Sequence, residues 1–224
     1  MASYLCWVDT IAGLIFDLDG VLIQSRSAHS RAFQEVLGEF GIRDFQYDQF
    51  AGWRTPEVFR AMLRDRHNRE VSDAVIAECS RRKSQLAREW IAAERPVEPD
   101  CVAIIRELSG RYRLALASSG SRPSVQAFLD ETGLRDAFRS VLSGEDVRLA
   151  KPDPEIFCRS IEALDARPEE CVVIEDAVAG IVAARAAGAH AVGFGKANDE
   201  ALSAAGARTV VGSLRELGAL FERA

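Results

Sequence analysis

The sequence is poor in the residues that build zinc clusters and disulfide frameworks. Its three histidines, His29, His67 and His190, are far apart, and its five cysteines include no Cys-x-x-Cys pair. This scatter argues against a zinc-hydrolase cluster and against paired disulfides. We therefore expect free thiols, as in a reducing cytoplasm.

Signals for membranes and nucleic acids are also missing. No basic segment precedes the first apolar stretch, which Asp9 and Asp17 interrupt, so we expect neither a signal peptide nor a membrane-spanning helix. A net charge of −6 disfavours general binding to nucleic acid or to anionic lipid. No Gly-x-Gly-x-x-Gly follows the first predicted strand, and no Walker lysine motif occurs. We predict a cytoplasmic monomer that acts on a small molecule.

The sequence does contain a regular alternation of strand-like and helix-like segments. Short apolar runs bounded by turn residues occur at Leu14–Leu18, Leu114–Ala117, Ser140–Leu142, Cys171–Ile174, Ala191–Phe194 and Thr209–Val211. Helix-like stretches separate most of them, among them Pro123–Thr132, Glu155–Leu164 and Val178–Ala187. Apolar strands that alternate with helices predict an α/β fold, with a Rossmann-like parallel sheet covered by helices on both faces. Such sheets bind ligands beyond the carboxyl ends of their strands.

Residues 25–97 interrupt this alternation. Their amphipathic helical segments are Ala28–Phe40, Pro56–Arg66, Asp73–Cys79 and Lys83–Ala93. We interpret residues 25–97 as a small all-α domain inserted into a discontinuous core domain, which comprises residues 1–24 and 98–224. Pro96 and Pro99 stiffen the return linker. A helical domain hinged over the first strand would act as a lid.

Two acids, Asp17 and Asp19, stand at the end of the first predicted strand and are followed by Gly20. Residues i and i+2 of a strand point to the same face, so both carboxylates should project together. Two like charges this close need a cation or a chemical task to balance them. The pattern suits a nucleophilic carboxylate beside an acid/base carboxylate, with Mg²⁺ between them and the substrate. A plain turn is the alternative, because Asp-x-Asp-Gly also favours β-turns.

Small hydroxyl residues and a glycine follow the second predicted strand. Ser118, Ser119 and Gly120 precede Pro123, a residue typical of the first turn of a helix. Exposed N–H groups at such a helix start can bind an anion. The alternative is an ordinary capped helix start, which occurs in every α/β protein.

A lysine and two further acids complete the set of polar residues near predicted strand ends. Lys151 is held on a rigid turn by Pro152, where its ammonium could meet a phosphate or a carboxylate, although a surface lysine fits the pattern too. Glu175 and Asp176 end another apolar strand. Because consecutive residues alternate faces, we expect one to meet the Asp17 site and the other to hold a metal-bound water or the loop. Asp176 would also suit the start of the next helix as its N-cap.

These four motifs, in this order and near strand ends, resemble those of the haloacid dehalogenase superfamily of phosphohydrolases. The matching positions are Asp17 to Gly20, Ser118, Lys151 with Pro152, and Glu175 with Asp176. The resemblance extends over essentially the whole chain. The helical insertion looks like the α-helical cap of the β-phosphoglucomutase-like subgroup, which includes sugar-phosphate and glycerol-phosphate phosphatases.

The resemblance implies a mechanism and a cofactor. Asp17 would form an aspartyl-phosphate, and Asp19 would protonate the leaving oxygen and then activate water. Ser118 and Lys151 would bind the transferring phosphoryl group. The implied cofactor is Mg²⁺, held by Asp17, by the backbone carbonyl of Asp19 and by the acidic fourth motif, Glu175 and Asp176. The implied substrate is a small phosphorylated metabolite such as a sugar, polyol or nucleoside phosphate.

Substrate contacts are expected from the loop after the second strand and from the cap. Ser119 and Gly120 are the candidates in the loop. In the cap, Trp53, Arg54, Lys83 and His29 could face the substrate. The alternatives are that Trp53 belongs to a core, that Lys83 is solvated, that His29 is packed within its helix and that Arg54 pairs with an acid on its own helix.

The resemblance favours a phosphatase over a mutase. Asp19 points to phosphate chemistry, because the dehalogenase members lack a second aspartate. Mutases of this kind carry a cap arginine three residues after a glycine, whereas Arg54 follows Gly52 by two residues, with Thr55 at the third. β-Phosphohexomutase remains the second candidate, and a catalytically idle binding protein the third. Gln24 replaces an acid that most relatives have before Ser25, which leaves the usual hinge hydrogen bonding open.

Overall fold

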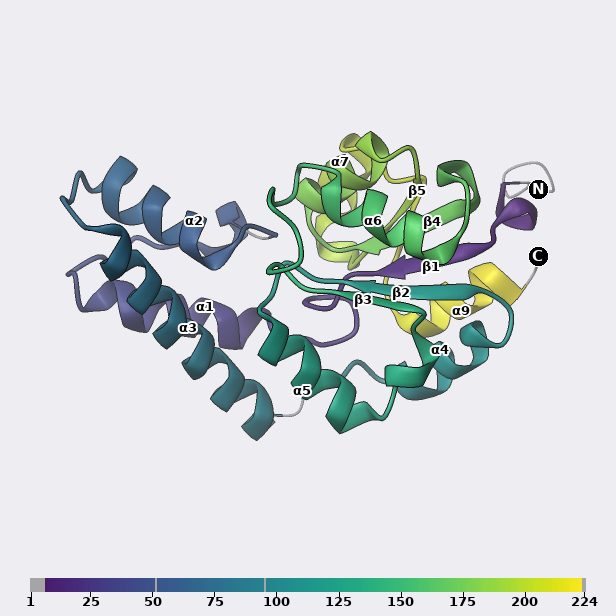
Figure 1. Cartoon of the computed structure of the whole chain (residues 1–224), viewed down its shortest axis with the longest axis horizontal. Coiled ribbons are helices and arrows are strands. Elements are labelled where there is room, and N and C mark those ends of the chain that lie inside the picture. Colours follow the sequence, from purple (N-terminus) through teal and green to yellow (C-terminus); the bar gives the residue numbers. More distant parts are fainter. Residues whose placement is uncertain (1–6, 51, 95, 223–224) are drawn as a thin grey trace.

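A six-stranded, all-parallel sheet forms the centre of the computed structural model, which describes residues 7–50, 52–94 and 96–222 (Figure 1). The strand order is β3-β2-β1-β4-β5-β6. The strands are β1 (Gly13–Phe16), β2 (Arg113–Ala117), β3 (Ser140–Leu142), β4 (Cys171–Glu175), β5 (His190–Phe194) and β6 (Thr209–Val211). All six strands predicted from the sequence are present, within one or two residues of the expected bounds.

The central strand, β1, marks the point at which the direction of winding reverses. From β1 the chain runs outward through β2 and β3 on one side, then returns to add β4, β5 and β6 on the other. In register, Leu14 is paired with Leu114 of β2 and with Val172 of β4. Open α/β sheets bind ligands at such a switch point, beyond the carboxyl ends of the strands. Asp17 follows β1 at this point.

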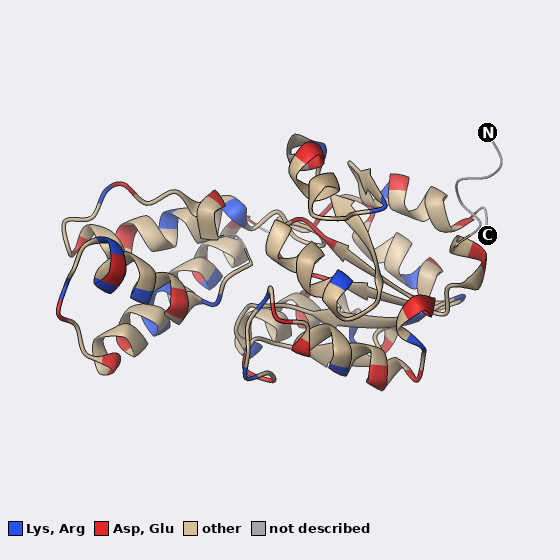
Figure 2. Ribbon diagram, turned by 90° about the horizontal axis from the view of Figure 1, so that it is seen from above, with Lys and Arg blue, Asp and Glu red and all other residues tan. Residues whose placement is uncertain are grey.

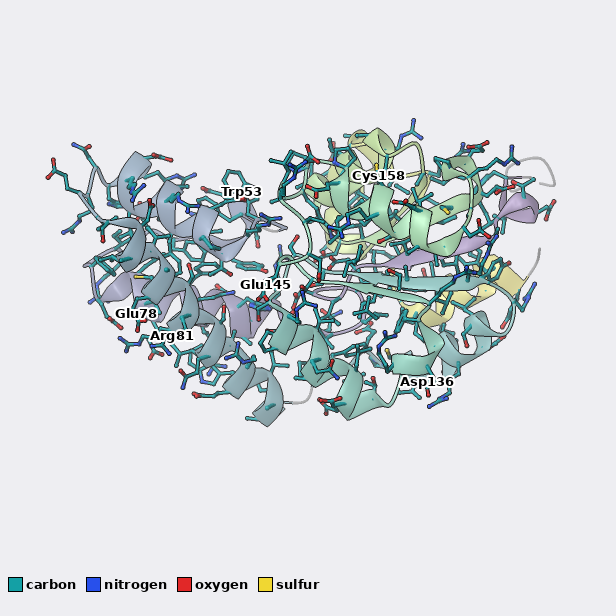
Figure 3. All side chains as sticks on the ribbon, in the orientation of Figure 1. Trp53, Glu78, Arg81, Asp136, Glu145 and Cys158 are labelled. Atoms are coloured by element: carbon teal, nitrogen blue, oxygen red, sulfur yellow. The ribbon has the colours of Figure 1, made fainter. Side chains whose placement is uncertain are left out.

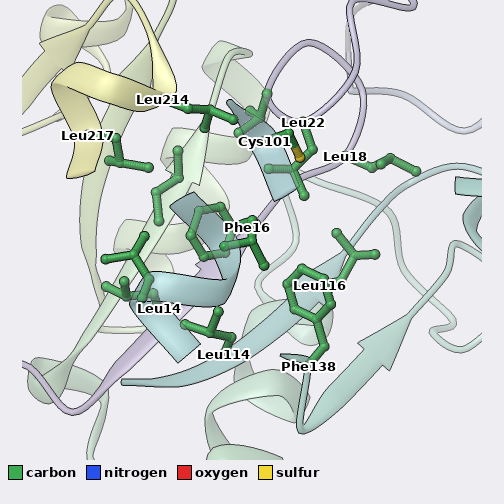
Figure 4. Close-up of a cluster of buried hydrophobic side chains, with 14 of the residues drawn as sticks. Leu14, Phe16, Leu18, Leu22, Cys101, Leu114, Leu116, Phe138, Leu214 and Leu217 are labelled. Atoms are coloured by element: carbon green, nitrogen blue, oxygen red, sulfur yellow. The ribbon is translucent and has the colours of Figure 1, made fainter. Parts of the chain in front are cut away.

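Helices cover both faces of the sheet, as expected. On one face lie α4 (Cys101–Ser109), α5 (Arg122–Thr132) and α9 (Leu214–Glu222), and on the other α6 (Glu155–Leu164), α7 (Val178–Ala186) and α8 (Asp199–Ala204). Leu14 and Phe16 pack with Leu116 and Leu214 in one buried cluster, and Ile15 packs in the cluster of the opposite face (Figure 4). A strand that is apolar on both faces is what a doubly covered sheet requires.

Three helices of the segment between β1 and α4 form a second body beside the sheet, which we call the helical insertion (residues 25–97). They are α1 (Arg26–Gly38), α2 (Thr55–Arg60), which continues as a π-helix over Ala61–Arg66, and α3 (Asp73–Glu94). The insertion has its own apolar cluster, which includes Phe33, Phe59 and Leu63. Figure 2 shows basic and acidic residues interspersed along its helices.

The separate helices predicted over Asp73–Cys79 and Lys83–Ala93 were wrong, because both belong to the continuous helix α3. The intervening residues Ser80, Arg81 and Arg82 include no glycine or proline that would end a helix. The buried stripe of Ile76, Cys79, Lys83 and Ala87 also continues across them at helical spacing. The two arginines between the predicted helices, Arg81 and Arg82, are exposed on α3.

The remaining short helical turns of the described chain are 3₁₀ segments at Val8–Thr10, Tyr47–Phe50, Arg135–Ala137, Pro168–Glu170 and Lys196–Asn198.

The four cysteines within the described residues are free thiols, whereas Cys6 lies outside those residues. No helix in the described part of the chain is both long and apolar enough to cross a bilayer.

The hinge between the insertion and the sheet is a pair of hydrogen-bonded linker segments. The amide of Gln24 donates to the carbonyl of Pro96 (2.7 Å), and the amide of Glu98 donates to that of Leu22 (2.9 Å). The side-chain amide of Gln24 also donates to the Glu98 carboxylate (3.0 Å). Gln24 therefore supplies a side-chain hydrogen bond across the hinge.

The packed core of the insertion predicts a large effect for a buried leucine. Leu63 is fully buried in the insertion, whereas Leu149 is 57% exposed. Leu63→Ala should lower the free energy of unfolding by about 2–5 kcal/mol, because it removes buried apolar contacts and leaves a cavity. The matched control Leu149→Ala should change it by no more than about 0.5 kcal/mol. Urea denaturation followed by circular dichroism measures both, and equal losses would contradict this packing.

Candidate active site

Asp17 is the first residue after β1 and is buried at the switch point of the sheet. Its amide donates to the carbonyl of Ile174 (3.0 Å), so its backbone still pairs with β4. Burial raises the pKa of the Asp17 carboxyl, and the ammonium of Lys151 opposes that rise. An ionised Asp17 therefore depends on positive charge close by.

Lys151 provides that charge from the loop between β3 and α6. Its ammonium donates to Asp17 Oδ1 (2.6 Å), to Glu175 Oε1 (2.9 Å) and to the carbonyl of Ala117 (3.3 Å). Burial alone would lower the pKa of Lys151, but the two carboxylates raise it above its ordinary value. A buried cation with two anionic partners stays charged. The alternative of a surface lysine is therefore wrong.

Glu175, the last residue of β4, positions this lysine. One carboxylate oxygen accepts from Lys151, and the other accepts from the amide of Ala177 (2.9 Å). Gly180 on α7 makes room for it, since a Cβ at that position would lie 1.9 Å from Glu175 Oε1. Any larger residue at 180 must displace this carboxylate, because the helix backbone cannot retreat from a buried ion pair.

Asp176 extends into the same site from the residue after β4. Oxygen atoms of Asp17, Glu175 and Asp176 lie within 4.8 Å of one another. Burial raises the pKa of Asp176, and the charges of Glu175 and Asp17 add to that rise. Within the described residues, its carboxylate has no hydrogen-bond or ion-pair partner. A buried carboxylate cluster with one unpartnered member is suited to a divalent cation with oxygen ligands.

The expectation that Asp176 could serve as a helix cap was wrong, because the N-cap of α7 is Ala177 and carries no side-chain cap bond. The Asp176 side chain instead occupies the space beside Gly20, which has no Cβ. A Cβ on Gly20 would lie 2.0 Å from Asp176 Oδ2, and the glycine has a φ of 87°. Position 20 therefore needs glycine both for its backbone conformation and for the space beside the acid.

Asp19 faces the insertion rather than the carboxylate cluster. Its Oδ1 accepts from the Ser25 hydroxyl (2.5 Å) and from His29 Nε2 (2.8 Å), while the Lys83 ammonium donates to His29 Nδ1 (2.8 Å). A lysine donor at Nδ1 leaves the ring proton on Nε2, which donates to Asp19. Although burial opposes them, these partners hold the pKa of Asp19 below its ordinary value.

The same network accounts for two residues of the insertion. Burial lowers the pKa of Lys83 to about 7, with Asp19 opposing that shift. Burial, together with the nearby Lys83, also lowers the pKa of His29. Lys83 is buried, so the expectation that it might be solvated was wrong. Both side chains line the cavity above Asp17, and their contact with substrate remains a prediction.

The loop after β2 closes another side of the cavity. Ser118 is buried, and its hydroxyl accepts from the amide of Gly120 (2.9 Å). Ser119 donates its hydroxyl proton to the carbonyl of Gly52 in the insertion (3.0 Å). Helix α5 begins at Arg122 with Pro123 in its first turn, as the sequence predicts.

Two residues of the loop before α2, Trp53 and Arg54, lie where the insertion meets the sheet. Trp53 is 42% exposed and contacts Phe50 edge to face, with ring centroids 5.5 Å apart, so the alternative of a core residue was wrong (Figure 3). Both terminal nitrogens of Arg54 donate to carbonyls of the core, those of Val147 (2.5 Å) and Arg148 (2.8 Å). Arg54 therefore does not pair with an acid on its own helix.

The cavity beside these groups is lined by residues of the helical insertion and of the α/β core. Its walls include residues that the sequence analysis did not single out as substrate contacts, namely Phe33, Tyr47, Phe50, Gly52, Thr55, Ser84, Ser121 and Ser124. Ser84 and Thr55 directly follow the predicted residues Lys83 and Arg54 in the sequence. This adjacency is the one sequence feature that could have identified them. Tyr47 and Phe50 come from a 3₁₀ turn with no recognisable motif.

Comparisons with known proteins agree with this geometry. A family model described as haloacid dehalogenase-like hydrolase matches residues 11–188. The chain is 33% identical over 187 residues to the fructose-1-phosphate phosphatase YqaB of Escherichia coli (strain K12), which covers 81% of this chain and 95% of the relative. It is 27% identical to a phosphorylated carbohydrates phosphatase of Thermotoga maritima, over 84% of this chain and 90% of the relative.

Among solved structures, a β-phosphoglucomutase of Clostridium difficile superimposes with a TM-score of 0.81 and 25% identity. The match covers 95% of this chain and 98% of that one. The superposition agrees with the parallel sheet and the helical insertion. The chain is thus a haloacid dehalogenase-like hydrolase, homologous to sugar-phosphate phosphatases.

Proposed function

We propose that this enzyme is an Mg²⁺-dependent phosphatase that hydrolyses a phosphorylated sugar or polyol through an aspartyl-phosphate on Asp17. The observation that carries the proposal is the buried contact of Lys151 with Asp17 and Glu175, beside the unpartnered carboxylate of Asp176. Phosphoryl transfer needs little more from a protein than a positioned nucleophile and positive charge around the phosphoryl oxygens.

In the first step, a carboxylate oxygen of Asp17 attacks phosphorus, and the bond from phosphorus to the ester oxygen breaks. Lys151 lies 2.6 Å from Asp17, so its ammonium can stay beside the phosphoryl oxygens as their charge develops. Ser118 and the amides of the loop after β2 provide hydrogen-bond donors on the other side of the cavity. The covalent intermediate divides one difficult hydrolysis into two easier steps.

Asp19 supplies the proton for the leaving oxygen and later accepts one from the attacking water. Its contacts with Ser25 and His29 favour the ionised form, so it must exchange these contacts before it can carry a proton. Both contacts come from the insertion. Release of these contacts when the insertion moves would let Asp19 take up a proton, which would link substrate entry to acid/base catalysis.

The carboxylates of Asp17 and Asp176 would hold Mg²⁺, and Glu175 borders the same cluster. Both oxygens of Glu175 already accept hydrogen bonds, from Lys151 and from Ala177, so its main task is to hold the lysine and the loop. When bound, Mg²⁺ supplies positive charge that neutralises the phosphoryl oxygens and keeps the acids ionised. The backbone carbonyl of Asp19 remains a predicted ligand.

Phosphorylated sugars are the substrate class best supported by the relatives, which are named as phosphatases of fructose 1-phosphate and of phosphorylated carbohydrates. The hydroxyls of Ser84, Ser119 and Thr55 line the cavity and suit a polyhydroxylated leaving group. Mutase activity is the second candidate, because a β-phosphoglucomutase shares the fold. Phosphate release from fructose 1-phosphate, compared with interconversion of glucose 1- and 6-phosphates, decides between them.

Asp17→Asn should abolish Mg²⁺-dependent hydrolysis of p-nitrophenyl phosphate, because the amide keeps the shape of the side chain but is a poor nucleophile. The exposed Asp136 gives a matched control, since Asp136→Asn should retain full activity. Steady-state kinetics on both purified variants is the measurement. If Asp17→Asn kept a tenth of the wild-type rate, a covalent mechanism on Asp17 would be wrong.

Asp176→Asn should raise the Mg²⁺ concentration needed for half-maximal activity by about tenfold or more, because it removes one carboxylate from the cluster. Titration of Mg²⁺ into chelator-treated enzyme gives this concentration. Full activity of the wild type after exhaustive chelation would instead rule out the metal requirement.

Gly180→Ala should lower kcat/KM about tenfold or more with the fold intact, because the new methyl group displaces Glu175 from Lys151. Gly38→Ala is the matched control, since nothing lies within 4 Å of a Cβ at position 38. Kinetics with p-nitrophenyl phosphate, together with circular dichroism, compares the two variants. Unchanged kinetics in Gly180→Ala would mean that the Glu175 contact does not position the lysine.

A further inference from the structure

Arg54 of the insertion makes a bidentate hydrogen-bond contact with the core. It is the N-cap residue of α2, and its two terminal nitrogens donate to the successive carbonyls of Val147 and Arg148, more than ninety residues away in the chain. The planar guanidinium matches two adjacent acceptors in a way that a lysine ammonium cannot. The contact therefore fixes both the distance and the orientation of the insertion.

The two carbonyls belong to the loop that carries Lys151. This loop, residues 143–154, is ordered by two acids, one within it and one at the start of α6. Asp146 accepts from Ser143, and Glu155 accepts from the amides of Arg148 and Leu149 (2.9 Å each). The carbonyls of Val147 and Arg148 are thus turned outward to accept Arg54. Lys151, which binds Asp17, follows Arg148 by three residues.

Arg54 contacts the core at a place separate from the hinge linkers. The hinge hydrogen bonds are those of Gln24, and the contacts near Asp19 come from α1. Apart from the hinge, Arg54 and the Ser119–Gly52 hydrogen bond hold the insertion against the core. Among the described residues, the Arg54 Nε is buried without a hydrogen-bond partner, which offsets part of the gain from its two hydrogen bonds.

We propose that Arg54 is a positioning residue, a clasp that fastens the insertion to the Lys151 loop and does not contact the transferred phosphoryl group. This inference rests on the proposed phosphatase function. It gives Arg54 a role different from the substrate contact that the sequence suggests. A clasp acts on every phosphate ester alike, because closure of the cavity does not depend on the leaving group.

The test compares wild type, Arg54→Ala and Arg54→Lys on fructose 1-phosphate and on p-nitrophenyl phosphate. Arg54→Ala should lower kcat/KM about tenfold on both substrates, as expected for loss of a charge-assisted contact. Arg54→Lys, whose ammonium can reach one of the two carbonyls, should recover part of that loss on both. Arg60→Ala, an exposed arginine at the end of α2, should match the wild type.

Hydrogen–deuterium exchange of the substrate-free protein supplies a second readout. Exchange over residues 52–58 and 143–151 should rise in Arg54→Ala but not in Arg60→Ala, with the unfolding midpoint unchanged. This arm needs no activity, so it still tests the clasp if the wild type hydrolyses neither ester. A loss confined to fructose 1-phosphate, an Arg54→Lys no better than Arg54→Ala, or unaltered exchange would each overturn the proposal.

Discussion

The buried ammonium of Lys151, shared by Asp17 and Glu175, is the interaction on which the site depends. An aspartate buried at the end of a central strand would hold its proton and be useless as a nucleophile. The lysine makes the ionised form possible, yet a lone cation in that position would itself be costly to bury. Glu175 balances the second charge, and Gly180 leaves space for Glu175. The motifs that contain Asp17, Lys151 and Glu175 therefore form one electrostatic unit. Each of the three side chains depends on the other two for its charge and position.

The insertion contacts parts of the site with a proposed chemical role at two places. Close to the hinge, Ser25 and His29 bind the carboxylate of Asp19, and a buried Lys83 sets the tautomer of the histidine. At the second place, Arg54 binds the loop that carries Lys151. Both places couple the position of the insertion to a residue with a proposed chemical role. In the proposed mechanism, opening of the cavity to substrate and rearrangement of these groups would be parts of the same movement.

Local chemistry explains why much of the site could be predicted from the sequence. Asp17, Lys151 and Asp176 were expected near strand ends, and a parallel sheet brings those ends to a single edge whatever the details of packing. The burial of Lys83 and the hydrogen bonds of Asp19 could not be predicted, because they depend on how α1 and α3 pack together and lie relative to the loop after β1. The same holds for Arg54, whose partners are backbone carbonyls that carry no sequence signature.

The sequence by itself determined the alternation of strands and helices, the place of the insertion and the identity of the chemical groups. Those properties follow from periodicity, turn residues and motif order, which are local in the chain. Only the tertiary structure decided that Lys83 is buried, that Glu175 holds a lysine and that Asp19 is engaged by the insertion. These outcomes depend on contacts between residues far apart in the chain, and on burial, which changes the energy of a charge according to the partners that packing brings to it.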